Sequence, residues 1–246
     1  MMMAILTALA VASASAASAH YGDTLLAQEL SRHPTLDYAS ISLDNSNNAR
    51  FEVGTAGPRS KHVVVPLLDA LGTNIGTLEL AFDRSPGKNT VATIESDVSR
   101  HVYSKAVLAE PDPFVAGAVR SSFGQALVER ELSREPRLVT IAFHVALPER
   151  DNQIIASNFG RIGKAADSDD QRVIASSTIL QEETNNGQRL AVELPLLDRS
   201  GRTIGALSTS FLTGPGPGEK AIAYRSALRV QHDLSRSIAR LERLAK

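Results

Sequence analysis

The chain contains one pattern twice, and this internal repeat constrains its fold more than any other feature. The segment Leu30–Pro34 (LSRHP) returns 102 residues later as Leu132–Pro136 (LSREP), and Pro66–Asp69 (PLLD) returns 129 residues later as Pro195–Asp198. The second copy therefore holds about 27 additional residues between its landmarks. Repeats of roughly 100–120 residues match the commonest domain size. The sequence predicts two related units, the second of them enlarged.

Composition excludes several classes of function. A formal charge of −1 gives no general attraction to nucleic acid or to anionic membranes. The absence of cysteine excludes disulfides, thiolate metal sites and cysteine nucleophiles. The six histidines form none of the usual metal-ligand spacings, so neither a metal nor another cofactor is expected. No G-x-S-x-G motif, P-loop or G-x-G-x-x-G motif is present, and we expect a protein that is not an enzyme.

The N-terminus is typical of an exported protein. Residues 1–19 contain no charged side chain, include an apolar stretch over residues 4–12, and end in Ala17–Ala19 (ASA), which matches the A-x-A cleavage pattern. A flexible start rich in Ala and Ser is the alternative. We expect residues 1–19 to be a signal peptide and the mature protein to be periplasmic or secreted. No later stretch approaches the ~20 apolar residues of a membrane span.

Export is directly testable. N-terminal sequencing of the protein from its native host should begin at or near His20. An intact Met1 in a soluble cytoplasmic fraction would contradict the signal-peptide prediction.

Hydrophobic periodicity predicts the same succession of elements in each copy. A helix is expected before Pro34 in the first copy, and another before Pro136 in the second. The positions that predict them are Leu25, Leu26, Glu29 and Leu30, then Val115, Val119, Phe123, Ala126 and Leu127. Alternating residues then predict strands over 38–43 and 138–145.

Each copy closes with a predicted hairpin and a helix. Strands over 62–68 and 75–82, and over 189–197 and 203–211, flank short connections that start with Asp and contain Gly, which favour turns. Apolar stripes then predict the closing helices, the first of which should link the two units. The stripes are Val91, Ile94, Val98 and Val102, then Ala227, Val230, Leu234, Ile238 and Leu241.

These elements predict an α/β fold of the α+β kind, with two units that each form an antiparallel sheet flanked by helices, because each sheet face needs an apolar cover. The first unit should span residues 20–110, including its linking helix. The second, enlarged unit should span residues 111–246, including the C-terminal helix.

The hairpins also resemble those of a known family. The pattern PL-L-D-x-x-G-x-x-I-G-x-L of Cache domains, which are extracytoplasmic PAS-like sensory domains, is matched in both copies, and GAF domains use a similar G-x-x-I-G-x-L hairpin. The matching residues are Pro66, Leu67, Asp69, Gly72, Ile75, Gly76 and Leu78, then Pro195, Leu196, Asp198, Gly201, Ile204, Gly205 and Leu207. The resemblance implies tandem PAS-like units that bind a small molecule.

The segment Ile155–Lys164 resembles the part of the Cache domain that leaves a strand and folds over the pocket. The resemblance assigns ligand binding to Ser157, Asn158, Arg161 and Lys164. A guanidinium holds a carboxylate through two hydrogen bonds, so an organic anion is the expected ligand class. The alternative is that Arg161 and Lys164 form surface ion pairs with Asp167, Asp169 or Asp170.

The acidic run itself has two interpretations. Several carboxylates could bind Ca²⁺, although the spacing of an EF-hand loop is missing. Alternatively, Asp167 caps a short helix that runs through Gln171 and Val173, with Asp169 and Asp170 in its first turn.

Two functions are compatible with these features. The first is an exported tandem sensory-type protein that binds a small, anionic ligand without catalysis and passes a signal or cargo to a separate envelope signalling or transport protein. The second is a periplasmic adaptor or structural protein that binds another envelope protein and no small ligand. The first copy favours the adaptor, because it has only the short, loop-like segment Asp44–Arg50 where the second copy has its long segment.

Overall fold

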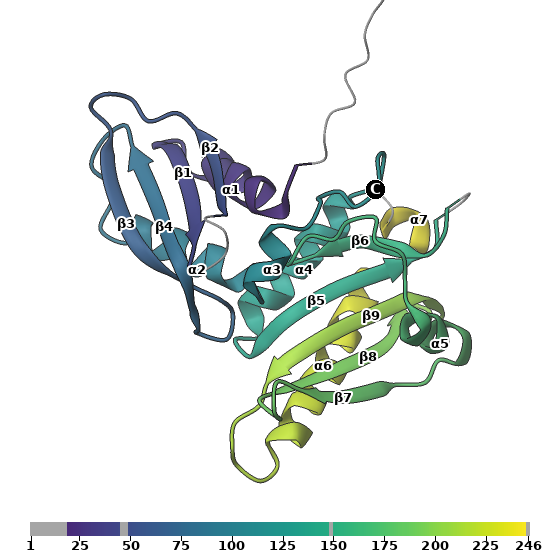
Figure 1. The fold of residues 1–246 in the computed structure, drawn as a ribbon. Coiled ribbons are helices and arrows are strands. Elements are labelled where there is room, and N and C mark those ends of the chain that lie inside the picture. Colours follow the sequence, from purple (N-terminus) through teal and green to yellow (C-terminus); the bar gives the residue numbers. More distant parts are fainter. Residues whose placement is uncertain (1–18, 45–48, 148–149, 245–246) are drawn as a thin grey trace, which may run out of the picture.

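The structure is a computed structural model that describes residues 19–44, 49–147 and 150–244. It contains a four-stranded and a five-stranded antiparallel sheet, each accompanied by helices (Figure 1). The predicted fold class, two sheet-plus-helix units, is confirmed. The signal-peptide prediction for residues 1–19 lies outside the described residues except for Ala19, and so does most of the loop that follows Asp44.

The first unit is built around the four-stranded sheet. Its elements are α1 (Tyr21–Arg32), β1 (Leu36–Leu43), β2 (Arg50–Gly54), β3 (Lys61–Leu68), β4 (Asn74–Phe82), α2 (Thr90–Arg100) and the short α3 (Lys105–Leu108). The second unit follows α3 after an irregular segment. Its elements are α4 (Ser122–Arg134), β5 (Leu138–Val145), β6 (Gln153–Ser157), α5 (Ser168–Ser176), β7 (Leu180–Thr184), β8 (Arg189–Leu197), β9 (Thr203–Leu212), α6 (Glu219–Ser237) and α7 (Leu241–Leu244).

The two sheets have the same order of corresponding strands. The first runs β2-β1-β4-β3, and the second runs β6-β5-β9-β8 with β7 added at the edge. Most of the residues that the second copy has in excess lie between β6 and β8, in the connection that contains α5 and β7. The enlargement therefore lies mainly in this connection, and the rest of the second unit keeps the arrangement of the first.

The repeated Pro-Leu-Leu-Asp landmarks end β3 and β8, and their aspartates begin the hairpin turns. In the first unit the Asp69 carboxylate accepts hydrogen bonds from the backbone N–H groups of Leu71 and Thr73, both at 2.9 Å. In the second unit Asp198 accepts from Ser200 and Arg202 at 2.9 and 3.1 Å. An aspartate that bonds the backbone two and four residues later closes a tight turn without further support. The hairpins predicted from the sequence are confirmed.

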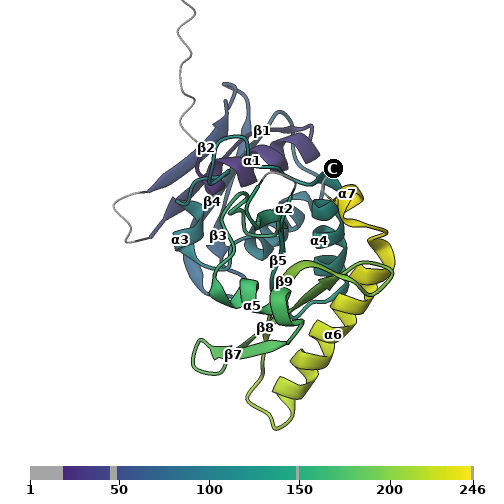
Figure 2. The ribbon, with the colours of Figure 1, turned by 90° about the vertical axis from the view of Figure 1, so that its right-hand side faces the viewer.

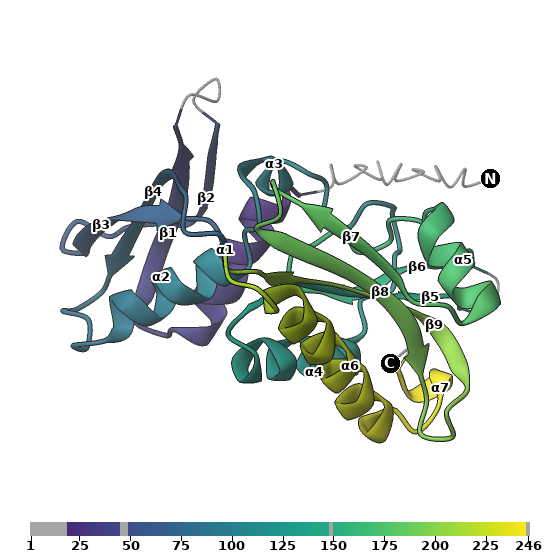
Figure 3. The ribbon, with the colours of Figure 1, turned by 90° about the horizontal axis from the view of Figure 1, so that it is seen from below.

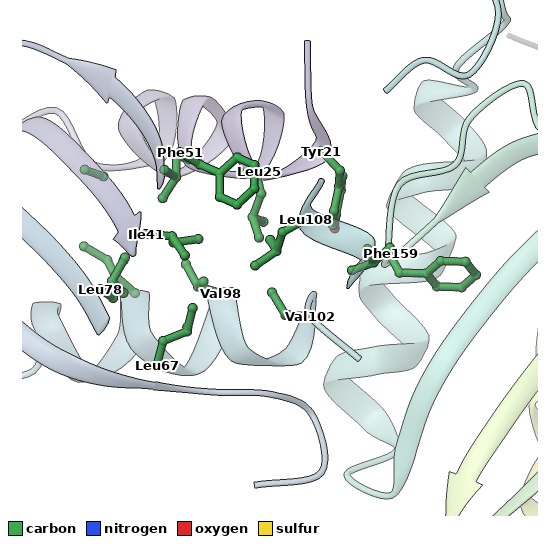
Figure 4. Close-up of a cluster of buried hydrophobic side chains, with 14 of the residues drawn as sticks. Tyr21, Leu25, Ile41, Phe51, Leu67, Leu78, Val98, Val102, Leu108 and Phe159 are labelled. Carbon is green, nitrogen blue, oxygen red and sulfur yellow. The ribbon is translucent and has the colours of Figure 1, made fainter. Parts of the chain in front are cut away.

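One face of the first sheet packs on α1 and α2, as Figure 3 shows from below. Ile41 of β1 and Leu78 of β4 are paired on adjacent strands. They belong to one hydrophobic core with Ile94 and Val98 of α2 (Figure 4). Ile94, Val98 and Val102 are fully buried, so the predicted apolar stripe of this helix faces the core.

The second sheet is covered on its inner face by α4 and α6 (Figure 2). Leu190, Val192, Leu194 and Leu196 of β8 alternate into this core. Two helix boundaries predicted from the sequence are wrong. The helix α4 begins at Ser122, because the Ser121 hydroxyl caps the N–H of Gly124, and Val115 lies outside the helix with 49% exposure. The helix α6 ends at Ser237, and Leu241 belongs to the separate α7.

The two units contact each other through buried side chains. Phe159 and Ile162 of the second unit belong to the hydrophobic core of the first. Asn158 is 1% exposed and bonds three backbone groups: its Oδ1 accepts from the Ile141 N–H, and its Nδ2 donates to the carbonyls of Val139 and Arg100, all at 2.9 Å. Because Arg100 ends α2 and Ile141 lies in β5, this amide joins the two units. None of the helices that the structure describes is long and apolar enough to cross a membrane.

Candidate functional site

The outer face of the second sheet, opposite α4 and α6, carries polar and small side chains. Across β5, β9 and β8, Thr140 and Ala191 lie opposite Ser210, while Ala142 and Glu193 lie opposite Ser208. Alternation along a strand sends these residues to the side away from the apolar core. Over the middle strands this face is covered, since Ala142 is fully buried and Ser210 is 1% exposed, whereas Ala191 and Glu193 near the β7 edge are half-buried.

The helix α5 covers one end of this outer face. Its start is fixed by a capping box, in which the Asp167 carboxylate accepts from the N–H groups of Asp169 and Asp170 while Asp170 accepts from the Asp167 N–H. The prediction that Asp167 caps a short helix is confirmed. The acidic run therefore has a structural role at this helix end, where the helix dipole favours negative charge.

Asp170 also binds the sheet below. It accepts a 3.1 Å hydrogen bond from the Ser208 hydroxyl, and its Oδ2 lies 2.9 Å from Nδ1 of His144. Burial by itself would raise the pKa of Asp170, but the contact with His144 and the hydrogen bonds from the Asp167 N–H and the Ser208 hydroxyl together hold the pKa below the usual value. The contacts of Asp170 with Ser208 and His144 hold α5 on the outer face.

A cavity of about 270 Å³ opens between α5, β7 and β8. It is lined by Asp169, Arg172, Leu180, Gln181, Glu182, Ala191 and Glu193. Oε2 of Glu193 is buried and has no hydrogen-bond partner among the described residues. Burial, and next the negative charge of Asp170, raise the pKa of Glu193 to about 7. Arg172 is paired with Asp169, so it does not neutralise this carboxyl.

Arg189 lies two positions from Ala191 on the same strand, and it has no carboxylate partner among the residues that the structure describes. Arg189 donates from Nη2 to the Ser210 hydroxyl at 3.0 Å, and Ser210 in turn lies 2.6 Å from the Thr140 hydroxyl. Nε of Arg189 is buried and has no hydrogen-bond partner among the described residues. Burial lowers the pKa of Arg189, as expected for a guanidinium that is desolvated without a neighbouring anion in contact.

An aromatic ring from the first unit adjoins this cation. The guanidinium carbon of Arg189 lies 5.8 Å from the centre of the Tyr103 ring, and that of Arg161 lies 5.6 Å from it. Distances below about 6 Å allow a cation–π attraction. Tyr103, which follows α2, thus brings the first unit to the edge of the outer face.

The four residues predicted as ligand-binding lie in one segment, but their side chains contact different neighbours. Arg161 donates two hydrogen bonds to the carboxylate of Glu110. Lys164 is half-buried, with its Nζ 5.7 Å from the ring centre of Phe114. Ser157 donates to the Gly160 carbonyl, and Asn158 bonds the backbone groups described above. The alternative pairing of Arg161 with Asp167, Asp169 or Asp170 is wrong, since Glu110 takes that place.

Sequence reasoning missed Arg189 and Glu193, and with them His144. The available signal was the alternation Arg189-x-Ala191-x-Glu193 in a predicted strand, which places both charges on one face. In most antiparallel sheets such a face is simply solvated. Here α5 and Tyr103 partly cover the face. Both lie elsewhere in the sequence, so the strand itself gives no sign of them.

A larger cavity of about 410 Å³ lies between the units, where α2 and the β3–β4 turn approach the start of β5. Its lining includes Asp69, Ser96, Ser99, Arg100 and Val139. Asp69 is engaged by its own turn and Arg100 donates to the Leu132 carbonyl. No side-chain atom described in this lining is buried without a hydrogen-bond partner, whereas Glu193 Oε2 is, so the smaller cavity on the outer face is the better candidate for ligand binding.

Comparisons with known proteins give only distant fold likenesses. No family model and no curated protein matches the chain. Among solved structures, the PobR inducer-binding domain of Acinetobacter in complex with 3-hydroxybenzoic acid matches 48% of this chain and 98% of its own, with 12% identity and a TM-score of 0.31. The type II free methionine-R-sulfoxide reductase of Thermoplasma acidophilum matches 49% and 94%, with 14% identity and a TM-score of 0.30.

A third structure, PelD of Pseudomonas aeruginosa PAO1, matches 85% of this chain and 74% of its own, with 16% identity and a TM-score of 0.25. The neighbours thus include a domain that binds a small molecule. At these TM-scores they assign neither a family nor a ligand to this chain, and the resemblance to Cache domains stays a prediction.

Proposed function

We propose that the second unit binds a small molecule with a carboxylate and a protonated amine, such as an amino acid or a short peptide, on the outer face of its sheet. The observation that carries this proposal is the pair Arg189 and Glu193. Each has a buried polar atom that lacks a partner among the described residues, and both belong to the same face of β8.

The geometry suits a ligand with separated charges. Four residues of strand place the Cα atoms of Arg189 and Glu193 about 13 Å apart, and only Ala191 lies between them on this face. The ligand carboxylate would accept from the free Nε of Arg189, and its amine would donate to Glu193. Buried polar groups without partners cost free energy, and a ligand that satisfies both recovers it. The proposed ligand thus carries the anionic group that the sequence predicts, but Arg189 would bind it in place of Arg161.

The proposal is for binding without catalysis. The Ser208 hydroxyl donates to Asp170, and the imidazole nearby contacts Asp170 as well. In this arrangement the carboxylate lies between hydroxyl and imidazole, so the imidazole does not activate the hydroxyl as a nucleophile. We further propose that the protein acts outside the cytoplasm, as its N-terminal sequence suggests, and passes a signal or the ligand to a separate envelope protein.

One observation favours the adaptor alternative. No described helix covers the outer face of the first sheet, where Val64 is 62% exposed. Around it, Glu79 forms an ion pair with Arg50, and its carboxylate lies 2.9 Å from Nδ1 of His62. A solvated face of this kind needs no ligand and can contact another protein.

A ligand screen distinguishes the two functions. Thermal shifts of the wild type with amino acids, short peptides, dicarboxylates, amines and purines should show stabilisation by molecules that carry both charges. No stabilisation by any class would contradict ligand binding and favour the adaptor.

Two substitutions test the site itself. Arg189→Gln should weaken binding of a hit about ten- to a hundredfold, because a charge-assisted hydrogen bond contributes roughly 1.5–3 kcal/mol. Arg225→Gln, which changes an exposed arginine of α6, is the matched control and should leave affinity unchanged. Equal affinities of both variants, measured by calorimetry, would place the site elsewhere.

The pH dependence adds an independent readout. With a pKa of about 7, Glu193 is mostly protonated at pH 6 and mostly ionised at pH 8. Affinity for an amine-bearing ligand should therefore rise over this range in the wild type, and the rise should be absent in Glu193→Gln. An identical pH profile in both proteins would remove Glu193 from the site.

A further inference from the structure

A second cluster of chemically active side chains lies in the first unit, far in sequence from the outer face of the second sheet. Glu29 belongs to the last turns of α1, His33 follows that helix directly, and Asp97 comes from α2. One carboxylate oxygen or ring nitrogen of each lies within 4.8 Å of the corresponding atom of the other two. Two oxygens and one imidazole nitrogen thus converge where the two helices meet.

Only one of the two carboxylate oxygens of Glu29 has a hydrogen-bond partner among the described residues. The residue is fully buried, with 0% exposure. Its Oε1 accepts a 2.8 Å hydrogen bond from Arg32, whereas Oε2 has no hydrogen-bond partner among the described residues. Nε2 of His33 lies 3.5 Å from this Oε2. A buried carboxylate oxygen in this situation carries a desolvation cost without compensation.

The backbone around the three residues is held in place. The His33 N–H donates to the Glu29 carbonyl at 3.1 Å, and the His33 carbonyl accepts from Leu36 at 2.8 Å. On α2, the Asp97 carbonyl lies 2.6 Å from Nδ1 of His101. The opposite nitrogen of His101 lies 3.1 Å from the carboxylate of Glu129 in α4. The cluster is therefore set between elements whose backbone is hydrogen-bonded, and its three ligand atoms already lie within 4.8 Å of one another.

We propose that Glu29, His33 and Asp97 form a binding site for a divalent transition-metal ion, of which Zn²⁺ is the best fit. Zinc takes imidazole nitrogen and carboxylate oxygen at about 2.0–2.2 Å and accepts three protein ligands with water as the fourth. The imidazole disfavours Mg²⁺ and Ca²⁺, which prefer sites made only of oxygens. Because Arg32 holds Oε1, Glu29 would bind through Oε2 alone.

The charges around the site agree with a dication. Two carboxylates and the guanidinium of Arg32 leave a net charge of −1 when His33 is neutral, and Glu29 and Asp97 repel each other. An ion between them would join α1 to α2 and give Glu29 the partner that it lacks. The sequence held a partial signal, since Glu29 and His33 are four residues apart at the end of a predicted helix, but Asp97 could not be placed beside them without the fold.

The test is titration of the full chain, freed of metal with a chelator, with ZnCl₂. We expect one ion per chain by calorimetry and a higher melting temperature with zinc, since an ion that binds only the folded state stabilises it. MgCl₂ at the same concentration should do neither. Substitution with Co²⁺ should give visible absorption bands typical of a site with nitrogen and oxygen ligands.

Variants decide whether these residues bind the ion. His33→Gln and Asp97→Asn change half-buried side chains, and circular dichroism would verify that both variants fold. Each should weaken zinc binding at least about tenfold. Removal of a residue that only hydrogen-bonds to a metal ligand already lowers the metal affinity about 10–100-fold. His62→Gln and His232→Gln, at exposed histidines far from the cluster, are the matched controls and should bind as the wild type does. Absence of zinc binding, or equal affinity in all four variants, would overturn the proposal.

Discussion

Val98→Asp should unfold the first unit under conditions in which the wild type is stable. Val98 is fully buried between α2 and the sheet, in the cluster that includes Leu67 and Leu78 (Figure 4). None of the hydrophobic neighbours in that cluster can pair with a carboxylate, so its burial should cost several kcal/mol. Domains of this size are stable by only about 5–15 kcal/mol. The melting temperature and the urea midpoint should therefore fall steeply.

The first unit provides its own control for this substitution. Val64→Asp introduces the same side chain on β3, but at a position that is 62% exposed. It should cost about 1 kcal/mol at most, because the position is at the surface, although Asp is a poor strand former and Glu79 lies opposite on β4. Equal melting temperatures for Val98→Asp and Val64→Asp would show that the apolar stripe of α2 does not face a core.

Asn158→Ala should give the second large loss of stability, and for a different reason. Removal of the amide leaves the Ile141 N–H and the carbonyls of Val139 and Arg100 without this partner. Each buried polar group left unsatisfied costs about 1–3 kcal/mol, so the sum should reach about 3 kcal/mol or more. Chemical denaturation followed by circular dichroism measures it. The loss should also separate the units, since the bond to Arg100 crosses between them.

Asn89→Ala is the matched control. Asn89 is exposed at the start of α2 and its side chain makes no capping hydrogen bond. Its removal should cost well under 1 kcal/mol. A comparable loss in both variants would mean that asparagine itself, and not the position of Asn158 between the units, sets the effect.

Local sequence patterns predicted the elements whose causes are local. The hairpins were placed within one residue of their observed ends, because Asp69 and Asp198 close their turns with their own side chains. The cap at Asp167 was found for the same reason. The start of α4 was not, since Val115 and Val119 continue the helical spacing while Ser121 determines where the helix begins.

The candidate sites depend on neighbours that are distant in sequence. Arg161 looked like a free cation because its partner, Glu110, lies 51 residues away. Arg189 and Glu193 looked like solvated residues of a strand, since nothing in their own segment indicates α5 above them. Local periodicity predicts which face a side chain is on, whereas the tertiary fold determines what else lies on that face.

The shared strand order also bears on how such a protein can change over time. In the first sheet β2 and β3 lie at opposite edges, and in the second sheet β6 and β8 lie on opposite sides of β5 and β9. The connection between the two strands must therefore pass from one side of the sheet to the other. Six residues make this passage in the first unit, and α5 and β7 fill it in the second. Longer connections add little entropic cost. Insertions at this one position can therefore create, reshape or remove a binding face while both hydrophobic cores stay intact, and the first unit could acquire a site by the same route.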